Sequence, residues 1–243
     1  MTLPVFVADL AGATVGALLE VSGAEAHHAT KARRLQSGDF VSLSDTRGLI
    51  AIGEVLEVGK TQMAVTVTQL REVPIAEPQL IVVQAIAKGD RGELAVQMLT
   101  EIGVDEIIPW SAARSVAVWR GDRAEKSLAK WRRTAYESSK QARRAHFALV
   151  GDPVTTVEVA ALLDQADHAF VLHEEATEPL ISVPMTLSGR IVVVVGPEGG
   201  ISPEEVAIFG VERTRRLGES VLRTSTAGVA AGAALLAHCG RWS

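Results

Sequence analysis

The stretch Ile191-Val-Val-Val-Val-Gly-Pro-Glu-Gly-Gly200, followed by Ile201-Ser-Pro-Glu-Glu205, decides the fold of this chain. Its opening run of β-branched residues is typical of a strand that is buried on both faces. The run ends at a glycine and a proline, because proline cannot donate a hydrogen bond to a sheet. Ser202 is a good helix N-cap, Pro203 suits the first helical position, and Glu205 completes a capping box. The stretch therefore predicts a strand, a glycine-rich loop and a helix.

The glycine-rich loop is a candidate ligand site. In open α/β sheets, ligands bind beyond the carboxyl ends of the strands, where such loops lie. Glycines leave backbone N–H and C=O groups bare, so a ligand can approach the main chain directly. The loop lacks the Gly-Lys-Ser/Thr sequence of a P-loop and the glycine spacing of a dinucleotide-binding fold. From the loop alone, an unusual ligand site and a plain tight turn both remain open.

Composition and length limit the class of protein. The chain has 243 residues, 47% of them apolar, which is enough for one large domain or two small ones. No apolar stretch reaches the ~18 residues of a membrane helix, and the N-terminus has no basic segment preceding an apolar one. The single Cys239 excludes an internal disulfide framework and a cysteine-rich zinc site. We expect a soluble, cytoplasmic protein.

The charges are unevenly distributed along the chain. The net charge is -5, so a nucleic-acid ligand would require the cations to be concentrated in one place. Segments 31–34 and 126–144 are basic, whereas 151–210 is mostly acidic. If the protein binds nucleic acid, we expect these two basic segments to make the contacts.

The N-terminal part of the chain predicts a small β-barrel. Residues 40–44 and 62–70 alternate between polar and apolar, and 49–58 also resembles a strand. Short strands at this spacing are typical of small barrels. Before them, 25–39 predicts a short helix that ends at Gly38. The cations near its end suit the helix macrodipole, which is the favoured interpretation; phosphate contact is the alternative.

After a proline-rich linker at 74–78, the pattern changes to alternating strands and helices. We predict strands over 79–86, 105–110, 169–173 and 191–195, and helices over 93–102, 125–144, 157–163, from Pro203, and over 226–238. This order indicates an α/β domain with a parallel sheet. The helix over 125–144 has a surplus of cations, which slightly favours nucleic-acid contact over a solvated face. The last helix has a glycine- and alanine-rich face that packs closely, against its own domain or a second copy.

Several motifs together resemble a known family. Gly196-Pro-Glu-Gly-Gly-Ile-Ser202 and Leu217-Gly-Glu-Ser-Val-Leu-Arg-Thr-Ser-Thr-Ala227 closely resemble the cofactor-binding motifs of the SPOUT methyltransferases. The best match is the RsmE-type 16S ribosomal RNA (uracil-N3)-methyltransferase family. Further matching stretches lie in the family's order: His28 with Arg34 and Gly38-Asp39, Gln84 to Lys88, Glu101 to Val104, Lys140-Gln141 with Arg144, and Leu172-His173. Any one motif is weak, but five in order are specific.

The resemblance implies a fold and an activity. Residues 1–73 are expected to form a PUA-like β-barrel that binds RNA. Residues 77–243 are expected to form an α/β SPOUT domain with a trefoil knot, which binds the cofactor, catalyses the reaction and dimerises. The implied reaction is S-adenosylmethionine-dependent methylation of N3 of a specific uridine in 16S ribosomal RNA of the small subunit. We expect a homodimer, no membrane association and no metal, since His173 beside two carboxylates is a weak metal motif.

The resemblance also assigns roles to residues of this chain. It implies that the cofactor contacts Leu172, His173, Gly196, Pro197, Glu198, Gly199, Gly200, Leu217, Gly218, Val221 and Leu222. Arg223 is the candidate that stabilises negative charge on the uracil ring, and Glu198 either accepts the N3 proton or orients the loop. The expected RNA contacts are Lys31, Arg33, Arg34, Arg132, Arg133, Lys140 and Arg144.

The chain departs from the family pattern at several positions. The family usually has Arg at Ser220, Glu at Ser225, a small residue at Arg143 and Pro near Ala148. These departures put a side-chain role at 220 or 225 in doubt. Two rival hypotheses stay open, of which Ser220 and Ser225 could support the second. One is a SPOUT enzyme that methylates another RNA position, such as a ribose 2'-hydroxyl. The other is a ribosome-associated RNA-binding protein that has lost catalysis.

Overall fold

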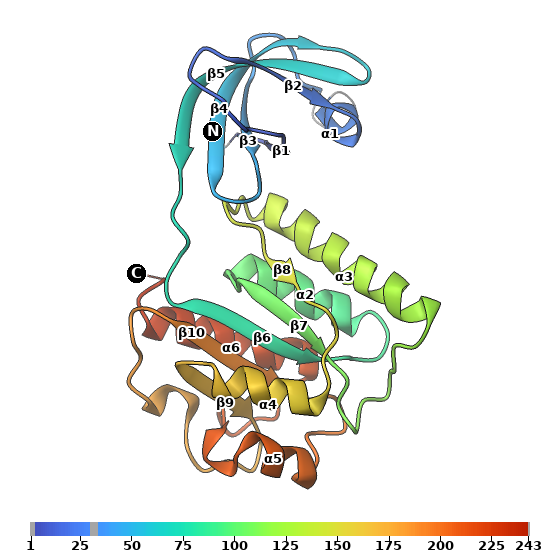
Figure 1. Ribbon diagram of the computed structural model, residues 1–243, viewed down its shortest axis with the longest axis vertical. Coiled ribbons are helices and arrows are strands. Elements are labelled where there is room, and N and C mark those ends of the chain that lie inside the picture. The colour runs from blue at the N-terminus through green and yellow to red at the C-terminus, as the bar shows by residue number, and fades with distance from the viewer. Residues whose placement is uncertain (1–2, 30–33, 243) are drawn as a thin grey trace. The chain divides into compact units, whose positions relative to one another are not determined.

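The computed structural model describes residues 3–29 and 34–242 and divides into two compact units (Figure 1). The first unit comprises Met1–Ile75 together with Lys140–Phe147, and the second comprises Ala76–Ser139 and Ala148–Ser243. The chain thus returns once to the first unit, whereas the family resemblance implied a single domain over 77–243. Lys31 and Arg33, which we expect to contact RNA, lie outside the described residues.

The first unit is a five-stranded, barrel-like sheet. Its strands are β1 (Val5–Val7), β2 (Leu18–Ser22), β3 (Phe40–Ser44), β4 (Leu49–Val58) and β5 (Gln62–Glu72), in the order β1-β3-β4-β5-β2. All pairs are antiparallel except β1 with β3. The alternation that predicted β5 places Met63, Val65 and Val67 in the core. The predicted β domain is therefore confirmed.

The helix predicted over 25–39 is much shorter than expected. In the structure, α1 covers Ala24–His28. Arg34 has φ 52°, in the left-handed region that an α-helix does not admit, so the helical pattern cannot continue to Gly38. The predicted end of the helix was wrong.

The second unit contains a six-stranded, fully parallel sheet. Its strands are β6 (Gln79–Ala85), β7 (Glu106–Trp110), β8 (Leu149–Val150), β9 (His168–Leu172), β10 (Arg190–Val195) and β11 (Thr214–Arg215). Their order is β11-β9-β10-β6-β7-β8. The helices are α2 (Arg91–Ile102), α3 (Asp122–Gln141), α4 (Thr156–Asp164), α5 (Pro203–Phe209) and α6 (Thr224–His238) (Figure 1). None of the helices in the described parts of the chain is both long and apolar enough to cross a membrane.

Two separate cores explain why β10 is an unbroken apolar run. Ile191 and Val193 belong to the core under α2, α3 and α6. Val192 and Val194 belong to the core under α4 and α5 on the other face. Successive side chains of a strand point to opposite faces, so a strand covered on both sides needs apolar residues at every position. β10 is therefore a central strand.

The glycine-rich face of α6 packs inside its own unit. A Cβ at Gly232 would lie 2.7 Å from Cδ1 of Ile102 in α2. A Cβ at Gly228 would lie 3.1 Å from Cγ2 of Val195 in β10. Both glycines therefore permit close contact with α2 and the sheet, and this face is occupied within one chain.

Candidate active site

Three loops meet at one edge of the parallel sheet. They follow β9, β10 and β11, which are neighbours in the sheet. Leu172 at the end of β9 pairs with Arg215 at the end of β11, so these ends lie level. Because parallel strands end at the same edge, the loops after them face a common space.

That space is a cavity of about 400 Å³, within the size range of small-ligand sites. Most of the residues expected to bind the cofactor or to act in catalysis line it: Leu172, His173, Gly196, Pro197, Glu198, Gly200, Leu217, Gly218, Val221, Leu222 and Arg223. Val221 and Leu222 are 77% and 40% exposed, which is unusual for adjacent apolar side chains. They provide apolar surface to a ligand.

Gly199 is the predicted loop residue that does not line the cavity. A Cβ at this position would lie 3.1 Å from both Cβ and the carbonyl oxygen of Arg114. The Arg114 guanidinium also donates a hydrogen bond to the Gly199 carbonyl oxygen, at 3.4 Å. Gly199 therefore faces the loop after β7, and its small size serves packing between loops.

Two other glycines of this loop have geometric reasons to be glycine. Gly200 has φ 75°, in the left-handed region. A Cβ at Gly196 would lie 2.8 Å from Cγ1 of Ile201. The main chain thus turns sharply beside the cavity, where Gly196 and Gly200 are partly exposed.

The predicted capping box is confirmed and also anchors the loop. Ser202 caps α5: its side chain accepts a hydrogen bond from the Glu205 N–H, and the Glu205 carboxylate accepts one from the Ser202 N–H at 3.0 Å. Glu205 is only 3% exposed. Its other oxygen accepts hydrogen bonds from the Ala113 N–H at 2.7 Å and the Thr156 hydroxyl at 3.2 Å. The buried carboxylate of Glu205 therefore links three segments: the start of α5, the loop after β7 and the start of α4.

Thr224 holds the loop from the opposite side. Its hydroxyl donates a hydrogen bond to the Gly196 carbonyl oxygen at 2.7 Å and accepts one from the Gln84 amide at 3.1 Å. Gln84 lies in β6 and is fully buried. Thr224 is the first residue of α6 and lines the cavity. The hydroxyl therefore joins the end of β10, the end of β6 and the loop that precedes α6.

Glu198 and Arg223 differ in their surroundings. Oε1 of Glu198 accepts a hydrogen bond from the Lys88 N–H at 3.2 Å and lies 3.6 Å from Nη1 of Arg91. By contrast, within the described chain no residue forms an ion pair or hydrogen bond with the Arg223 guanidinium. Glu198 is therefore held by the loop between β6 and α2, while Arg223 is available to a ligand.

Sequence reasoning missed several residues that line the cavity. They are Arg91, Glu174, Val195, Ile201, Arg215, Arg216, Glu219, Ser220, Thr224 and Ala227. Thr224 and Ala227 lie inside the motif that carried the resemblance, so the motif already contained a signal for them. Arg91 follows a different strand, and only the sheet order brings it here. Of the two departures within the second cofactor motif, Ser220 lines the cavity, whereas Ser225 is buried and does not.

The residues expected to contact RNA fall into two groups. Lys140 is 8% exposed, and its Nζ lies 2.7 and 2.9 Å from the Glu25 carboxylate oxygens, which argues against a phosphate contact. Arg132 donates hydrogen bonds to the Val150 carbonyl oxygen and to Asp152. Arg144 donates one to the His146 carbonyl oxygen. Arg34 and Arg133 are exposed, so they remain candidates.

Known proteins resemble this chain along almost its whole length. The RNA methyltransferase domain family matches residues 75–236, and the RNA methyltransferase PUA domain family matches residues 21–68. The ribosomal RNA small subunit methyltransferase E of Mycobacterium bovis is 37% identical over 234 residues, which cover 93% of this chain and 89% of the relative.

Two solved structures share the fold. One is a putative methyltransferase from Legionella pneumophila in complex with the bound cofactor SAM, with 24% identity, a TM-score of 0.86 and 98% of each chain covered. The other is a ribosomal RNA small subunit methyltransferase E from Neisseria gonorrhoeae bound to S-adenosyl methionine, with 24% identity, a TM-score of 0.85, and 97% of this chain and 98% of that chain covered. At this identity the likeness establishes the fold.

Proposed function

Because this chain belongs to the RNA methyltransferase family that includes the ribosomal RNA small subunit methyltransferase E enzymes, we propose that it methylates N3 of a specific uridine in 16S ribosomal RNA, with S-adenosylmethionine as donor. The observation that carries the proposal is the cavity at the ends of β9, β10 and β11, lined by three loops with accessible main chain. The cytoplasmic small ribosomal subunit, or a precursor of it, is the proposed substrate particle.

The cavity fits the donor in size and chemistry. Bound there, S-adenosylmethionine supplies an electrophilic methyl group. We expect main-chain groups of the part of this loop that lines the cavity, at Gly196, Glu198 and Gly200, to hydrogen-bond a polar ring edge, and Leu217, Val221 and Leu222 to provide apolar contacts for a planar base. The anchors at Thr224 and Glu205 hold these loops before the ligand arrives, which reduces the ordering cost of binding.

Arg223 is proposed to stabilise the reacting uracil. N3 lies on the pairing edge of uridine, so the base must be unpaired or flipped out of a helix to react. Loss of the N3 proton leaves negative charge on the ring, and a fixed cation in a sheltered site stabilises such charge. Arg223 is suited to this role because it lines the cavity and its guanidinium is not paired with a described carboxylate.

Glu198 is proposed to orient the glycine-rich loop. Its Oε1 contacts the Lys88 N–H and Arg91, and these contacts tie the carboxylate to the loop between β6 and α2 and to the start of α2. Glu198→Gln separates the two roles, because glutamine can still accept the Lys88 hydrogen bond. We expect turnover to be largely retained with an unchanged pH profile. Loss of turnover together with loss of the acidic limb of that profile would instead make Glu198 the base.

The function is tested with small ribosomal subunits from a strain that lacks this gene. Incubation with protein and methyl-labelled donor is expected to place the label on a base, at N3 of one uridine, as read by mass mapping of nucleosides. A label on a ribose hydroxyl would establish a different RNA methyltransferase. Binding of the donor without transfer to any particle would indicate an inactive RNA-binding protein.

The role of Arg223 is tested by Arg223→Ala. Removing one charge-stabilising donor from an active site typically costs about 10²–10³ in turnover. We expect a loss of that size, with donor affinity by calorimetry unchanged. Near-normal turnover would remove Arg223 from the mechanism.

A homodimer is part of the same proposal. Its support is the exposed apolar pair Val221 and Leu222 at the cavity, which a second subunit can help to cover. Sedimentation over a range of protein concentrations is expected to give twice the chain mass of 25.8 kDa. A monomer at all concentrations would contradict this part.

A further inference from the structure

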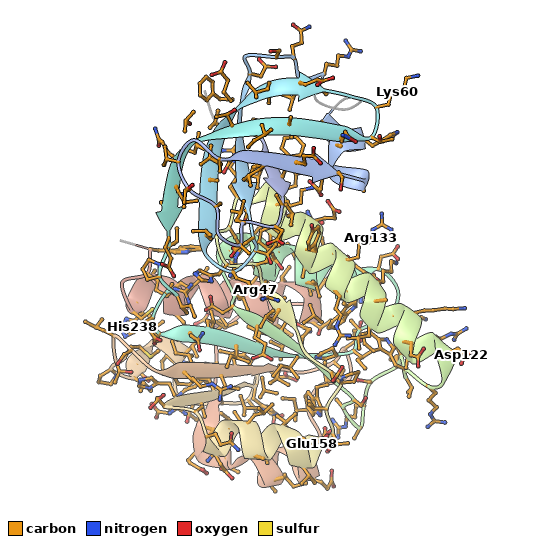
Figure 2. All side chains as sticks on the ribbon, turned by 45° about the horizontal axis from the view of Figure 1, so that its top comes forward. Arg47, Lys60, Asp122, Arg133, Glu158 and His238 are labelled. Carbon is orange, nitrogen blue, oxygen red and sulfur yellow. The ribbon has the colours of Figure 1, made fainter. Side chains whose placement is uncertain are left out.

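Helix α3 has a row of cations on one face. Arg123, Lys126, Lys130 and Arg133 are spaced three or four residues apart, so they lie on the same side of the helix. All four are exposed. At about 1.5 Å per residue, the row extends over about 15 Å. Figure 2 shows Arg133 projecting outward from α3.

The opposite face of α3 explains why the row faces outward. Trp131 and Ala135 are buried in the core under α2 and α6, and Leu128 packs against the same core. The helix therefore has a fixed orientation in its unit, and the cationic side cannot rotate inward. Glu137 is the acidic residue on the cationic side, whereas Asp122 and Glu125 lie along its flank.

Three of the four cations have no partner in the described part of the chain. Lys130 lies 3.0 Å from Glu93 and 3.8 Å from Asp90, and its hydrogen bond with Glu93 raises the pKa of the lysine. Among the described residues, none forms an ion pair or a side-chain hydrogen bond with Arg123, Lys126 or Arg133. Elsewhere on the helix, Arg132 and Lys140 are bound to Asp152 and Glu25. The helix thus separates its structural cations from its free ones.

We propose that Arg123, Lys126 and Arg133, here called the α3 stripe, bind the phosphate backbone of the RNA substrate. The inference rests on the proposed function. Unpaired cations on a protein of net charge -5 concentrate positive potential at one surface, and phosphates are the partner with complementary charge. No base edge is read by such a contact, so the stripe contributes affinity and orientation rather than sequence specificity.

Apart from Arg133, the α3 stripe consists of other residues than the RNA contacts that the family motifs predict. The motif points to Lys140 and Arg144, whose side chains are held by Glu25 and by the His146 carbonyl oxygen. The stripe instead uses Arg123 and Lys126, which belong to no motif, together with Arg133. Burial and pairing therefore move the proposed RNA contact toward the N-terminal half of α3.

The test measures binding to unmodified 16S RNA across a range of salt concentrations. Each lost phosphate contact reduces the slope of log affinity against log salt by about 0.7 for single strands. The triple variant Arg123→Gln, Lys126→Gln, Arg133→Gln is therefore expected to bind more weakly, with a slope shallower by about 2. The double variant Arg123→Lys, Arg133→Lys retains the charges and is expected to keep most of the slope.

A matched pair of single variants tests whether a cation without a described partner contributes more to RNA binding than a cation already paired with carboxylates. Lys126→Gln is expected to reduce the slope by about 0.7. Lys130→Gln removes the same charge from the same face, but it is expected to change the slope less because Glu93 and Asp90 already hold Lys130. Donor binding by calorimetry is expected to be unchanged in every variant, which shows that the methyltransferase unit is folded.

Distinct outcomes overturn distinct proposals. An unchanged slope and affinity in the triple variant would refute the stripe, whether or not the wild-type protein methylates RNA. Unchanged binding to naked RNA with weakened binding to assembled 30S particles would assign the stripe to a ribosomal protein instead, and would also refute it. Weakened RNA binding by the triple variant, with no methyl transfer by the wild type, would leave the stripe standing and refute the proposed reaction.

Discussion

Replacing Thr224 by valine tests whether the cavity loops are held in place by this single hydroxyl. Valine has nearly the shape of threonine and is also β-branched, so the start of α6 and the surrounding packing are retained. What is lost is the donor to the Gly196 carbonyl oxygen at 2.7 Å and the acceptor for the Gln84 amide at 3.1 Å. The substitution therefore removes polar contacts without leaving a large void.

The expected size of the effect follows from burial. Thr224 is 6% exposed, so water cannot fully replace the lost partner. Leaving a buried polar group unsatisfied costs about 1–3 kcal/mol. The Gln84 amide keeps the carbonyl oxygens of Ala85 and Thr224, each at 3.3 Å, which favours the lower half of that range. We expect a loss of about 1–2 kcal/mol in the free energy of unfolding.

The same contact is expected to influence donor affinity. If the Gly196 loop loosens in the free protein, binding of the donor must reorder it. Each ~1.4 kcal/mol of free energy needed for this reordering raises the dissociation constant tenfold. The cost of loosening cannot exceed the energy of the contact, about 2 kcal/mol at most, so the predicted weakening is about thirtyfold or less. Urea unfolding measures the change in stability, provided that the free energy of unfolding depends on urea concentration with the same slope in both proteins. Calorimetry measures the donor affinity.

Thr226→Val is the matched control. Thr226 is exposed in the same helical turn, and its hydroxyl donates to the Arg223 carbonyl oxygen at 3.1 Å. An exposed substitution of this kind usually changes stability by about 0.5 kcal/mol or less. If the Thr224 variant has the unfolding midpoint and donor affinity of this control, the hydroxyl does not hold the loop and the reasoning fails.

Three further predictions concern other anchors. Glu205→Gln must turn an amide donor toward at least one N–H, and we expect it to lose about 1.5–3 kcal/mol of stability in urea unfolding; a neutral result would contradict the triple anchor. Lys140→Met leaves Glu25 without its cation, and we expect a loss of about 3 kcal/mol with an unchanged RNA salt slope; a shallower slope would restore Lys140 as an RNA contact. Hydrogen bonds from the Thr155 backbone and hydroxyl lower the pKa of Glu158, so this contact stabilises the protein above the unfolded pKa and is lost as pH falls through the folded one. Thr155→Ala is expected to raise the pKa of Glu158, as measured by NMR titration. An unchanged pKa would refute the role of the Thr155 hydroxyl in lowering it.

The elements that the sequence determined by itself are those with local causes. The unbroken run of β10 requires cover on both faces, and the capping box at Ser202 and Glu205 requires only residues three apart. The glycine-rich loop between them was therefore placed correctly, and so were the alternating strands of the first unit. The family likeness depends on the same local motifs, which is why the residues around the cavity could be named in advance.

Tertiary structure decided which partners those residues meet. Gln84 and Thr224 are 140 positions apart, and Glu25 and Lys140 are 115 apart. Only the order of strands in the sheet and the chain's return to the first unit bring them together. A cation's charge is evident from sequence, but whether a carboxylate already holds it depends on such long-range contacts. For this physical reason the sequence alone predicted Lys140 as an RNA contact. Only the fold showed that Lys140 is held by a carboxylate, whereas Arg123, Lys126 and Arg133 are not held by one in the described part of the chain.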